Sequence, residues 1–133
     1  MFCSILAGQT SADFVLRTPE VSAFLDVRPL FRGHVLVVPR EHVVTIGEIA
    51  PAQIAPLFGA VSRIARAIEA GLGAHGSFVA INKTVSQSVP HLHVHVVPRH
   101  KGDGLRGFFW PRAKYESDEQ RLDYAARIAN ALE

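Results

Sequence analysis

In the segment 91–97, which reads HLHVHVV, histidine alternates with apolar residues until Pro98 interrupts the pattern. A period of two predicts a β-strand that sends the imidazoles to one face and the apolar side chains to the other. Successive rings would stand roughly 6.5 Å apart, which is two strand rises. Buried imidazoles need hydrogen-bond partners, so a row of them is a poor filling for a core. We therefore expect His91, His93 and His95 to face one small polar ligand.

Four further strands are predicted by short apolar runs that are bounded by turn residues. These runs are 14–16, 21–25, 34–38 and 77–81. Together with the histidine strand they predict an α+β fold, an antiparallel five-stranded sheet with its helices on one face. The other face of the sheet must then be covered or must bind something, and the histidines could lie on it.

The central helix is predicted over residues 54–68, where apolar side chains recur at spacings of three and four. Gly71 and Gly73 follow as stop signals, and Pro51 suits a first helical turn. Pro56 predicts either a kink or the beginning of the regular helix. The predicted apolar stripe comprises Ile54, Leu57, Phe58, Val61, Ile64, Ala65 and Ile68.

A C-terminal helix is predicted after Ser117, because Gln120 stands three residues later and completes a capping box. Its inward-facing residues would be Leu122, Ala125, Ile128 and Leu132. The length of 133 residues suits a single domain over 1–133. We expect its core over about 1–100 and a basic, aromatic segment with the last helix over 101–133.

The composition indicates an ordinary globular protein, with 48% hydrophobic and 20% charged residues. A net charge of +2 is too small to argue for a nucleic acid or a membrane surface as partner. Cys3 is the single cysteine, which excludes an internal disulfide and fits a reducing cytosol. We expect no signal peptide, because the N-terminus lacks its basic segment and apolar stretch, and no run approaches the roughly 20 apolar residues that span a bilayer. We expect a soluble, cytoplasmic protein.

One local exception to the near-neutral charge lies between residues 99 and 114, where five Lys or Arg residues stand against one Asp. Phe108, Phe109 and Trp110 are interleaved with them. Basic side chains with stacking aromatics suit single-stranded nucleic acid. Because the chain as a whole is nearly neutral, we favour a packed segment with a solvated rim, and we do not expect a nucleic-acid partner.

Two kinds of chemistry suit the row of histidines. A neutral imidazole attacks phosphorus and leaves well once protonated, so it can divide a nucleotidyl transfer into two easier steps. A backbone carbonyl must then hold its far nitrogen, and neighbouring imidazoles can donate to phosphate oxygens. The competing chemistry is metal binding, because HxH on a strand can place two imidazoles on one metal. No Asp or Glu lies between Glu69 and Asp103 to complete such a site locally.

The HLHVHVV string matches the signature of the histidine triad (HIT) family, in which three histidines alternate with apolar residues. Residues 33–42, GHVLVVPREH, resemble that family's GHxLVxPxxH segment. Residues 24–27 resemble its nucleotide-facing strand, 2–5 its N-terminal opening and 87–89 the stretch before the triad. These matches keep the family's order and extend to about residue 100. The resemblance implies a HIT-like fold whose sheet extends across a homodimer.

The resemblance also implies an activity, hydrolysis or transfer at the α-phosphate of a nucleoside phosphoramidate, a dinucleoside polyphosphate or a similar conjugate. No metal or other cofactor is required for this chemistry. By position, His93 is the nucleophile and forms a nucleotidyl-histidine that water cleaves. His91 and His95 flank it at the phosphate and the leaving group, and His34 joins them from the neighbouring strand. Ser88 donates toward the leaving group.

The nucleoside is expected to be a purine nucleoside held between one carboxylate and an apolar slot. Asp26 would accept hydrogen bonds from the ribose hydroxyls. The slot would be formed by Phe2, Ile5, Phe24, Leu25, Val27 and Leu36. Asn82 and Gln87 would contact phosphate or ribose. The loop 83–90 is about two residues shorter than in many members of the family, and a phosphate-binding role for Lys83 and Thr84 stays open.

Some bacterial members of the family carry a structural zinc held by an N-terminal CxxC pair and histidines. Cys3 stands alone in this chain, so we expect no metal site, and we expect His42 to cap or pack. Arg99, Lys101 and Arg106 could recognise the polyphosphate of a long leaving group. Two alternatives stay open: a purine-nucleotide-binding module without turnover, and a metal-dependent hydrolase that uses the histidine row.

Overall fold

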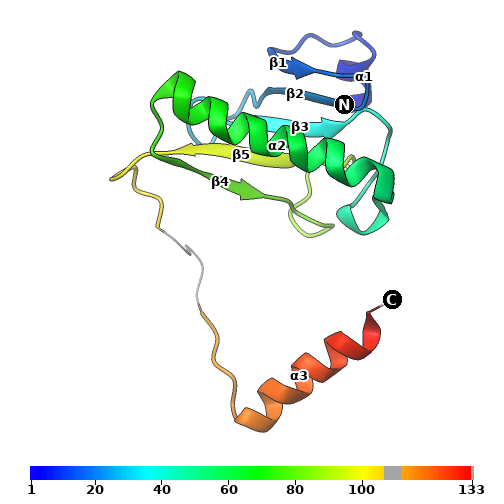
Figure 1. Ribbon diagram of the computed structural model, residues 1–133, viewed down its shortest axis with the longest axis vertical. Helices are drawn as coiled ribbons and strands as arrows, with labels where there is room; N and C mark the ends of the chain where they lie inside the picture. The colour runs from blue at the N-terminus through cyan, green and yellow to red at the C-terminus, as the bar shows by residue number, and fades with distance from the viewer. Residues whose placement is uncertain (107–111, 133) are drawn as a thin grey trace. The chain divides into compact units, whose positions relative to one another are not determined.

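The computed structural model describes residues 1–106 and 112–132, so Phe108, Phe109 and Trp110 lie outside the described residues. The chain divides into two compact units, Met1–Asp103 and Gly104–Glu133, and each is described by itself. The first unit contains a five-stranded antiparallel sheet with the strand order β1-β2-β3-β5-β4 (Figure 1). The predicted α+β class with a five-stranded antiparallel sheet is confirmed, whereas the single domain over 1–133 stays a prediction.

The strands lie close to where the sequence placed them. They are β1 Phe14–Arg17, β2 Val21–Leu25, β3 Val35–Pro39, β4 Gly76–Ala80 and β5 Val94–Arg99. Four of them agree with the predicted runs within one residue at either end. These four are bounded by local turn signals, which is why their positions follow from the sequence.

The fifth strand begins three residues later than predicted, so the expectation of one strand bearing all three histidines is wrong. The pairing of β3 with β5 ends where Val37 faces Val94. β3 then stops at Pro39, which has no N–H to donate. Leu92 instead donates its N–H to the carbonyl of Val43 at 2.6 Å. As a result, two of the histidines precede the strand and only His95 lies in it.

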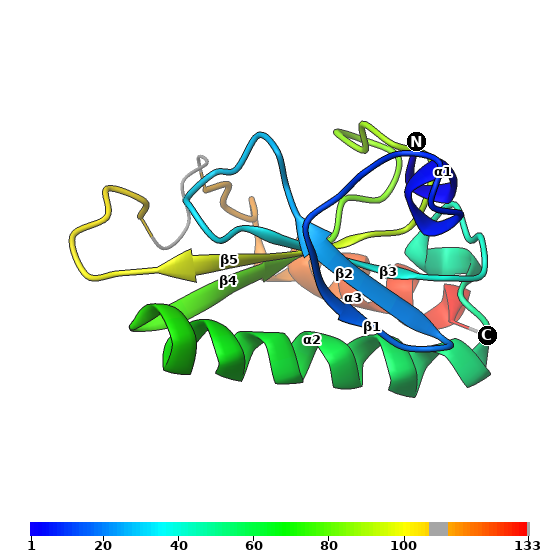
Figure 2. The same ribbon diagram turned by 90° about the horizontal axis from the view of Figure 1, so that it is seen from above.

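The two faces of the sheet carry different layers, as Figure 2 shows for the first unit. The long helix α2 (Pro51–Leu72) covers one face, where it packs on the valines of β2, β3 and β5. The short helix α1 (Phe2–Leu6) lies on the other face, against Phe24 and Leu36. Strand register places Phe24 opposite Leu36 and Leu36 opposite His95, so these side chains form one row on the α1 face.

Helix α2 starts at Pro51 and continues through Pro56, so the alternative that it starts at Pro56 is wrong. It ends where Gly73 adopts the left-handed conformation, with φ at +68°, which a glycine reaches without a Cβ clash. Its buried residues are Leu57, Ala60, Val61, Ile64 and Ile68. Ile54 and Phe58 of the predicted stripe are 44% and 40% exposed. The remaining helix of this unit is the 3₁₀ turn η1, Ile46–Glu48.

The second unit contains helix α3 (Asp118–Ala131). The Ser117 hydroxyl accepts the N–H of Gln120 at 3.0 Å, as a capping residue does. The Gln120 side chain accepts the N–H of Glu116 at 2.8 Å rather than that of Ser117. Helix α3 has no buried residue within the described chain. Its predicted apolar stripe is exposed within the second unit taken by itself, and the inward orientation stays a prediction for Leu122, Ala125, Ile128 and Leu132.

Candidate functional site

A cavity of about 450 Å³ opens on the α1 face of the sheet. Its lining comprises Met1, Phe2, Ile5, Ser11, Ala12, Phe24, Leu25, Asp26, Val27, Arg28, Leu36, Ser88, Val89, His93 and His95. The structure thus brings together the predicted apolar slot, the predicted carboxylate, the serine and two of the three histidines. The volume lies in the range of pockets that hold a small organic ligand, and its mostly apolar wall with few polar groups is typical of them.

Asp26 stands at the end of β2, where the chain leaves the sheet. Its N–H donates to the carbonyl of His34 at 2.9 Å, and its Oδ1 accepts the N–H of Arg28 at 2.9 Å. These bonds fix the carboxylate at the pocket wall. The Oδ2 atom lies 3.8 Å from His34 Nδ1, too far for a hydrogen bond. Burial lowers the pKa of His34 despite the nearby carboxylate, so the two do not form an ion pair at neutral pH.

His93 is 5% exposed and lines the cavity. Its Nδ1 lies 2.7 Å from the carbonyl oxygen of His91, so Nδ1–H donates to that oxygen. The Nε2 atom of a neutral ring then carries the lone pair. Phe2 and His95 stand edge-on to the His93 ring, each with its centroid at 5.0 Å. The arrangement presents one imidazole with a fixed tautomer to the cavity.

His34 and His95 form a directional chain of hydrogen bonds. The N–H of Leu30 donates to His34 Nδ1 at 3.1 Å, which places the proton of His34 on Nε2. That Nε2–H donates to His95 Nδ1 at 2.9 Å, so His95 in turn carries its proton on Nε2. Burial, with the nearby His93 and His34 rings, lowers the pKa of His95 to about 4. His95 is therefore neutral at pH 7 and offers one N–H donor.

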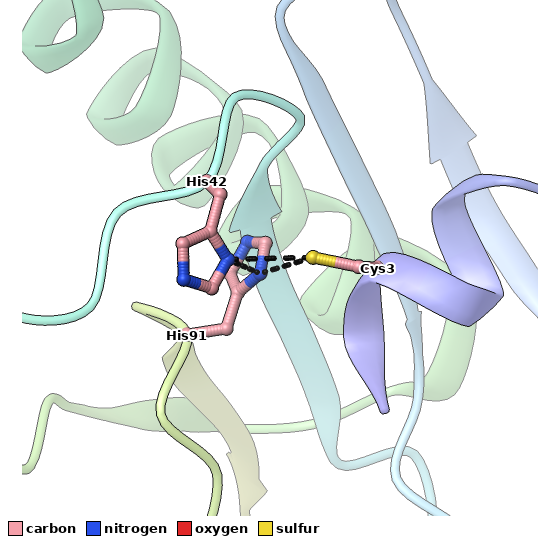
Figure 3. Close-up of side chains that lie close together, drawn as sticks. All are labelled: Cys3, His42 and His91. Atoms are coloured by element: carbon pink, nitrogen blue, oxygen red, sulfur yellow. Dashed lines mark hydrogen bonds between the residues drawn. The ribbon is translucent and has the colours of Figure 1, made fainter.

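His91 is 2% exposed and is not among the residues that line the cavity. Its Nε2–H donates to the carbonyl of Pro39 at 3.0 Å, so its lone pair is on Nδ1. That Nδ1 lies 3.1 Å from His42 Nδ1 and 3.6 Å from the sulfur of Cys3, as Figure 3 shows. Burial lowers the pKa of His91. Both ring nitrogens are engaged away from the cavity, so His91 contacts His93 through its backbone.

Two groups of side chains within the described residues offer three donor atoms that lie within 4.8 Å of one another. One group is Cys3, His42 and His91. The other is Asp26, His34 and His95. In the second group both nitrogens of His34 are already used, by the Leu30 N–H and by His95. The first group is the better candidate for a metal.

The remaining predicted contacts, Asn82 and Gln87, lie outside the lining of the cavity. The Gln87 amide donates to the carbonyl of Val44 at 2.6 Å and accepts the N–H of Thr84 at 2.9 Å. The Asn82 amide donates to the carbonyl of Ser86 at 3.3 Å. Both side chains therefore hold the loop 83–90 in shape, and their substrate contacts stay predictions.

The wall also contains residues that the sequence did not predict there, namely Met1, Ser11, Ala12, Arg28 and Val89. Met1 precedes helix α1, whose five residues are too few for a helical period to show in the sequence. Arg28 could have been inferred from its place two residues after Asp26. The Arg99 guanidinium forms an ion pair with Asp103, with Nε and Oδ2 at 2.6 Å, so its role toward a polyphosphate also stays a prediction.

Among the described residues, no helix combines the length and the apolar character that crossing a membrane requires.

Comparison with known proteins identifies relatives of the whole first unit. The model of the HIT domain family matches residues 7–102. The crystal structure of a member of the HIT family from Bacillus subtilis is 33% identical and superposes with a TM-score of 0.90, covering 100% of this chain and 96% of that chain. A Zn-bound histidine triad family protein from Mycobacterium smegmatis is 36% identical, with a TM-score of 0.75 over 98% and 96% of the two chains.

Two relatives carry the name of an activity. The asymmetrical bis(5′-nucleosyl)-tetraphosphatase of Schizosaccharomyces pombe is 37% identical over 89 residues, which are 65% of this chain and 49% of that protein. The adenosine 5′-monophosphoramidase hnt1 of the same organism is 28% identical over 119 residues, which are 90% and 88% of the two chains. Both names describe hydrolysis of a bond to a nucleotide phosphate.

Proposed function

This chain belongs to the HIT family, and from that membership we propose that it is a nucleotide hydrolase that cleaves the bond at the α-phosphate through a nucleotidyl intermediate on His93. The named relatives support the general activity, because one is a dinucleoside tetraphosphatase and the other a nucleoside phosphoramidase. The substrates we propose are therefore nucleoside phosphoramidates and dinucleoside polyphosphates.

The observation that carries the proposal is the hydrogen bond from His93 Nδ1 to the carbonyl of His91 at 2.7 Å. It leaves the lone pair on Nε2, and this is the atom that attacks phosphorus. The same carbonyl stabilises the positive charge that appears on the ring when the new bond forms.

In the first half-reaction His93 Nε2 bonds to the α-phosphorus, and the bond from phosphorus to the leaving nitrogen or oxygen breaks. The leaving group takes the electron pair of that bond together with a proton. This proton comes from solvent, because His95 is neutral and keeps its own. His95 instead donates a hydrogen bond from Nε2–H to phosphate, since the His34 contact puts its proton on Nε2. Ser88 lines the same cavity and offers a hydroxyl donor on the leaving-group side.

In the second half-reaction water attacks the phosphorus of the nucleotidyl-histidine. The phosphorus–nitrogen bond breaks, His93 recovers its lone pair, and the nucleoside monophosphate leaves. Throughout, Asp26 accepts from the ribose hydroxyls, and the base lies in the apolar slot between Phe2, Phe24 and Leu36. The base we propose is a purine, because a slot of this size and apolar lining suits a large flat ring.

We further propose that the protein acts as a homodimer whose sheets join. Strand β4 lies at one edge of the sheet, next to β5. An exposed strand edge pairs readily with another strand. Sedimentation equilibrium tests this separately from turnover: a monomer at all concentrations would contradict the dimer and leave the chemistry unaffected.

The activity is tested with adenosine phosphoramidate and diadenosine polyphosphates, with and without a chelator, on the wild type and on His93→Ala. We expect turnover that His93→Ala abolishes and whose kcat at saturating substrate the chelator leaves unchanged. An acid-quenched sample should show an intact-mass increase of one nucleotidyl group. Nucleotide binding without turnover would support the non-catalytic module instead, and a kcat that falls with chelator would support the metal-dependent hydrolase.

A further inference from the structure

Arg28 is a part of the cavity wall that the proposed reaction leaves unused. Among the described residues that line the cavity, it supplies the one lysine or arginine side chain. The residue is exposed, and within the described chain its guanidinium forms neither a hydrogen bond nor an ion pair. An arginine stays protonated at any pH at which the protein is folded. A permanent positive charge therefore stands at the cavity without a partner among the described residues.

A chain of contacts along the wall places Arg28 at the end that is away from the reacting groups. His95 Nδ1 lies 2.9 Å from His34 Nε2, and His34 Nδ1 lies 3.8 Å from Asp26 Oδ2. The other oxygen of this carboxylate, Oδ1, accepts the N–H of Arg28 at 2.9 Å. The arginine is thus joined to the far oxygen of Asp26, and both Asp26 and His34 separate its backbone from His95.

The position of Arg28 beside Asp26 indicates what its guanidinium meets. In the proposed function Asp26 accepts from the ribose hydroxyls, so Arg28 stands at the ribose and not at the reacting phosphate. A carboxylate that holds a ribose hydroxyl, with an arginine nearby, is also how dinucleotide-binding folds distinguish a free 2′-hydroxyl from a 2′-phosphate. A phosphate monoester carries close to two negative charges and three acceptor oxygens, and the fork of a guanidinium matches two of those oxygens.

We propose that Arg28 adapts the site to nucleotides that carry a second phosphate group on the 2′ or 3′ oxygen of the ribose. The inference rests on the proposed function, because it takes Asp26 to face the ribose. The guanidinium binds the added phosphate, while the phosphate at the 5′ position stays at His93. The added group takes no part in the reaction and remains on the nucleotide that leaves.

Asp26 and Arg28 act in opposite directions on such a ligand. The carboxylate accepts from the hydroxyl that remains free, but its negative charge repels the added phosphate, and Arg28 offsets this repulsion. Both residues are at least partly open to solvent, which screens charges and keeps the effect of one ion pair small. We therefore expect the added phosphate to tighten binding about three- to tenfold, with unmodified nucleotides still accepted.

The preference is tested by calorimetric titration of the purified full chain with AMP, adenosine 2′,5′-bisphosphate and adenosine 3′,5′-bisphosphate. One of the two bisphosphates should bind about three- to tenfold more tightly than AMP, and the isomer that does so identifies the oxygen. ADP is the matched control for charge, because its second phosphate extends the 5′ end. Binding of AMP with no gain from either bisphosphate would overturn the inference and leave nucleotide binding intact.

The assignment to Arg28 is tested by the ratio between the affinities for the preferred bisphosphate and for AMP. Arg28→Ala should bring this ratio to about one or below, whereas the ADP-to-AMP ratio should not change. Arg32→Ala is the matched control variant, because Arg32 is an exposed arginine of the same loop that does not line the cavity. Asp26→Asn should raise the ratio, since it removes the opposing charge. If Arg28→Ala weakens AMP and the bisphosphate by the same factor, the guanidinium does not bind the ribose phosphate and the inference is wrong.

Turnover separates this inference from the proposed function. With adenosine 5′-phosphoramidate as substrate, adding the preferred ribose phosphate should lower KM about three- to tenfold and leave kcat within about twofold. The reason is that a contact remote from the reacting atoms is equally strong before and in the transition state. A changed kcat with an unchanged KM would overturn the inference, because Arg28 would then act on the reacting phosphate. If neither compound is turned over and AMP does not bind, the proposed function fails, and the inference fails with it.

Discussion

His91 and His95 are four residues apart, yet they stand in two different chemical settings. His95 accepts a hydrogen bond from His34 and keeps an N–H donor at the cavity. His91 gives its N–H to the carbonyl of Pro39 and turns its lone pair toward Cys3, away from the cavity. The hydrogen-bond partner of the far ring nitrogen therefore decides what each imidazole can do. Residue type and spacing do not distinguish the two rings.

His93 lies between these two settings and depends on both. Its ring lines the cavity next to His95, while its Nδ1–H is held by the backbone of His91. The cavity side therefore supplies the groups that meet a substrate, and the Cys3 side supplies the support that orients the nucleophile. Substitutions on the two sides should therefore differ in the kind of effect they have as well as in its size.

The largest effect is expected from His93→Ala, which removes the atom that attacks phosphorus. We expect kcat for adenosine phosphoramidate to fall at least about 10⁴-fold, because loss of a nucleophile removes the covalent route entirely. Stopped-flow and steady-state assays measure this fall in kcat, and AMP binding to the variant is the control for an intact cavity. Residual turnover within tenfold of the wild type would mean that another residue is the nucleophile. It would also contradict the assignment of the substrate-contacting groups to the cavity side.

The second effect concerns stability. Burial and the neighbouring rings lower the pKa of His95 to about 4, against about 6.5 in the unfolded chain. Between these values the unfolded chain binds a proton that the folded chain does not, so stability falls as the pH falls from 6.5 toward 4. Between pH 7 and pH 5 the titration of His95 should lower the free energy of unfolding by about 2 kcal/mol. Urea unfolding at pH 7 and pH 5 measures this, and the free energy of unfolding should fall by that much more in the wild type than in His95→Gln. Equal falls in the two proteins would contradict the neutral, buried ring.

The third effect comes from His34, which fixes the tautomer of His95 without lining the cavity. His34→Leu removes the donor, so His95 is free to place its proton on either nitrogen. We expect kcat to fall about 10- to 100-fold with little change in KM, less than for the loss of a full acid–base group. His34→Gln retains an N–H donor and should recover part of kcat. An equal loss in both variants would mean that His34 matters for packing and not for the tautomer.

The parts of the fold that follow from the sequence are those set by neighbouring residues. Strand β2 occupies the predicted residues 21–25, because an apolar run between turns fixes both ends. The buried stripe of α2 likewise appears at Leu57, Val61, Ile64 and Ile68. The wall of the cavity depends on the strand register, which brings Phe24, Leu36 and His95 into one row, and it was expected only from the resemblance to the HIT family.

The parts that do not follow depend on contacts between distant residues. The partner of Leu92 is the carbonyl of Val43, and this bond, rather than the alternation of histidines, determines where β5 begins. The sulfur near His91 comes from a residue 88 positions earlier in the chain.

The smallest effect on catalysis is expected from His42→Ala, on the Cys3 side. His42 is hydrogen-bonded to His91 at 3.1 Å, and His34 is hydrogen-bonded to His95 at 2.9 Å. The two variants therefore each remove one hydrogen bond to a triad histidine and can be compared directly. His42 contacts the nitrogen of His91 that faces away from the cavity. His42→Ala should therefore change kcat less than about twofold, because the reacting groups stay in place. A fall in kcat as large as that of His34→Leu would show that the two sides do not act differently, and that His91 takes part in the chemistry directly.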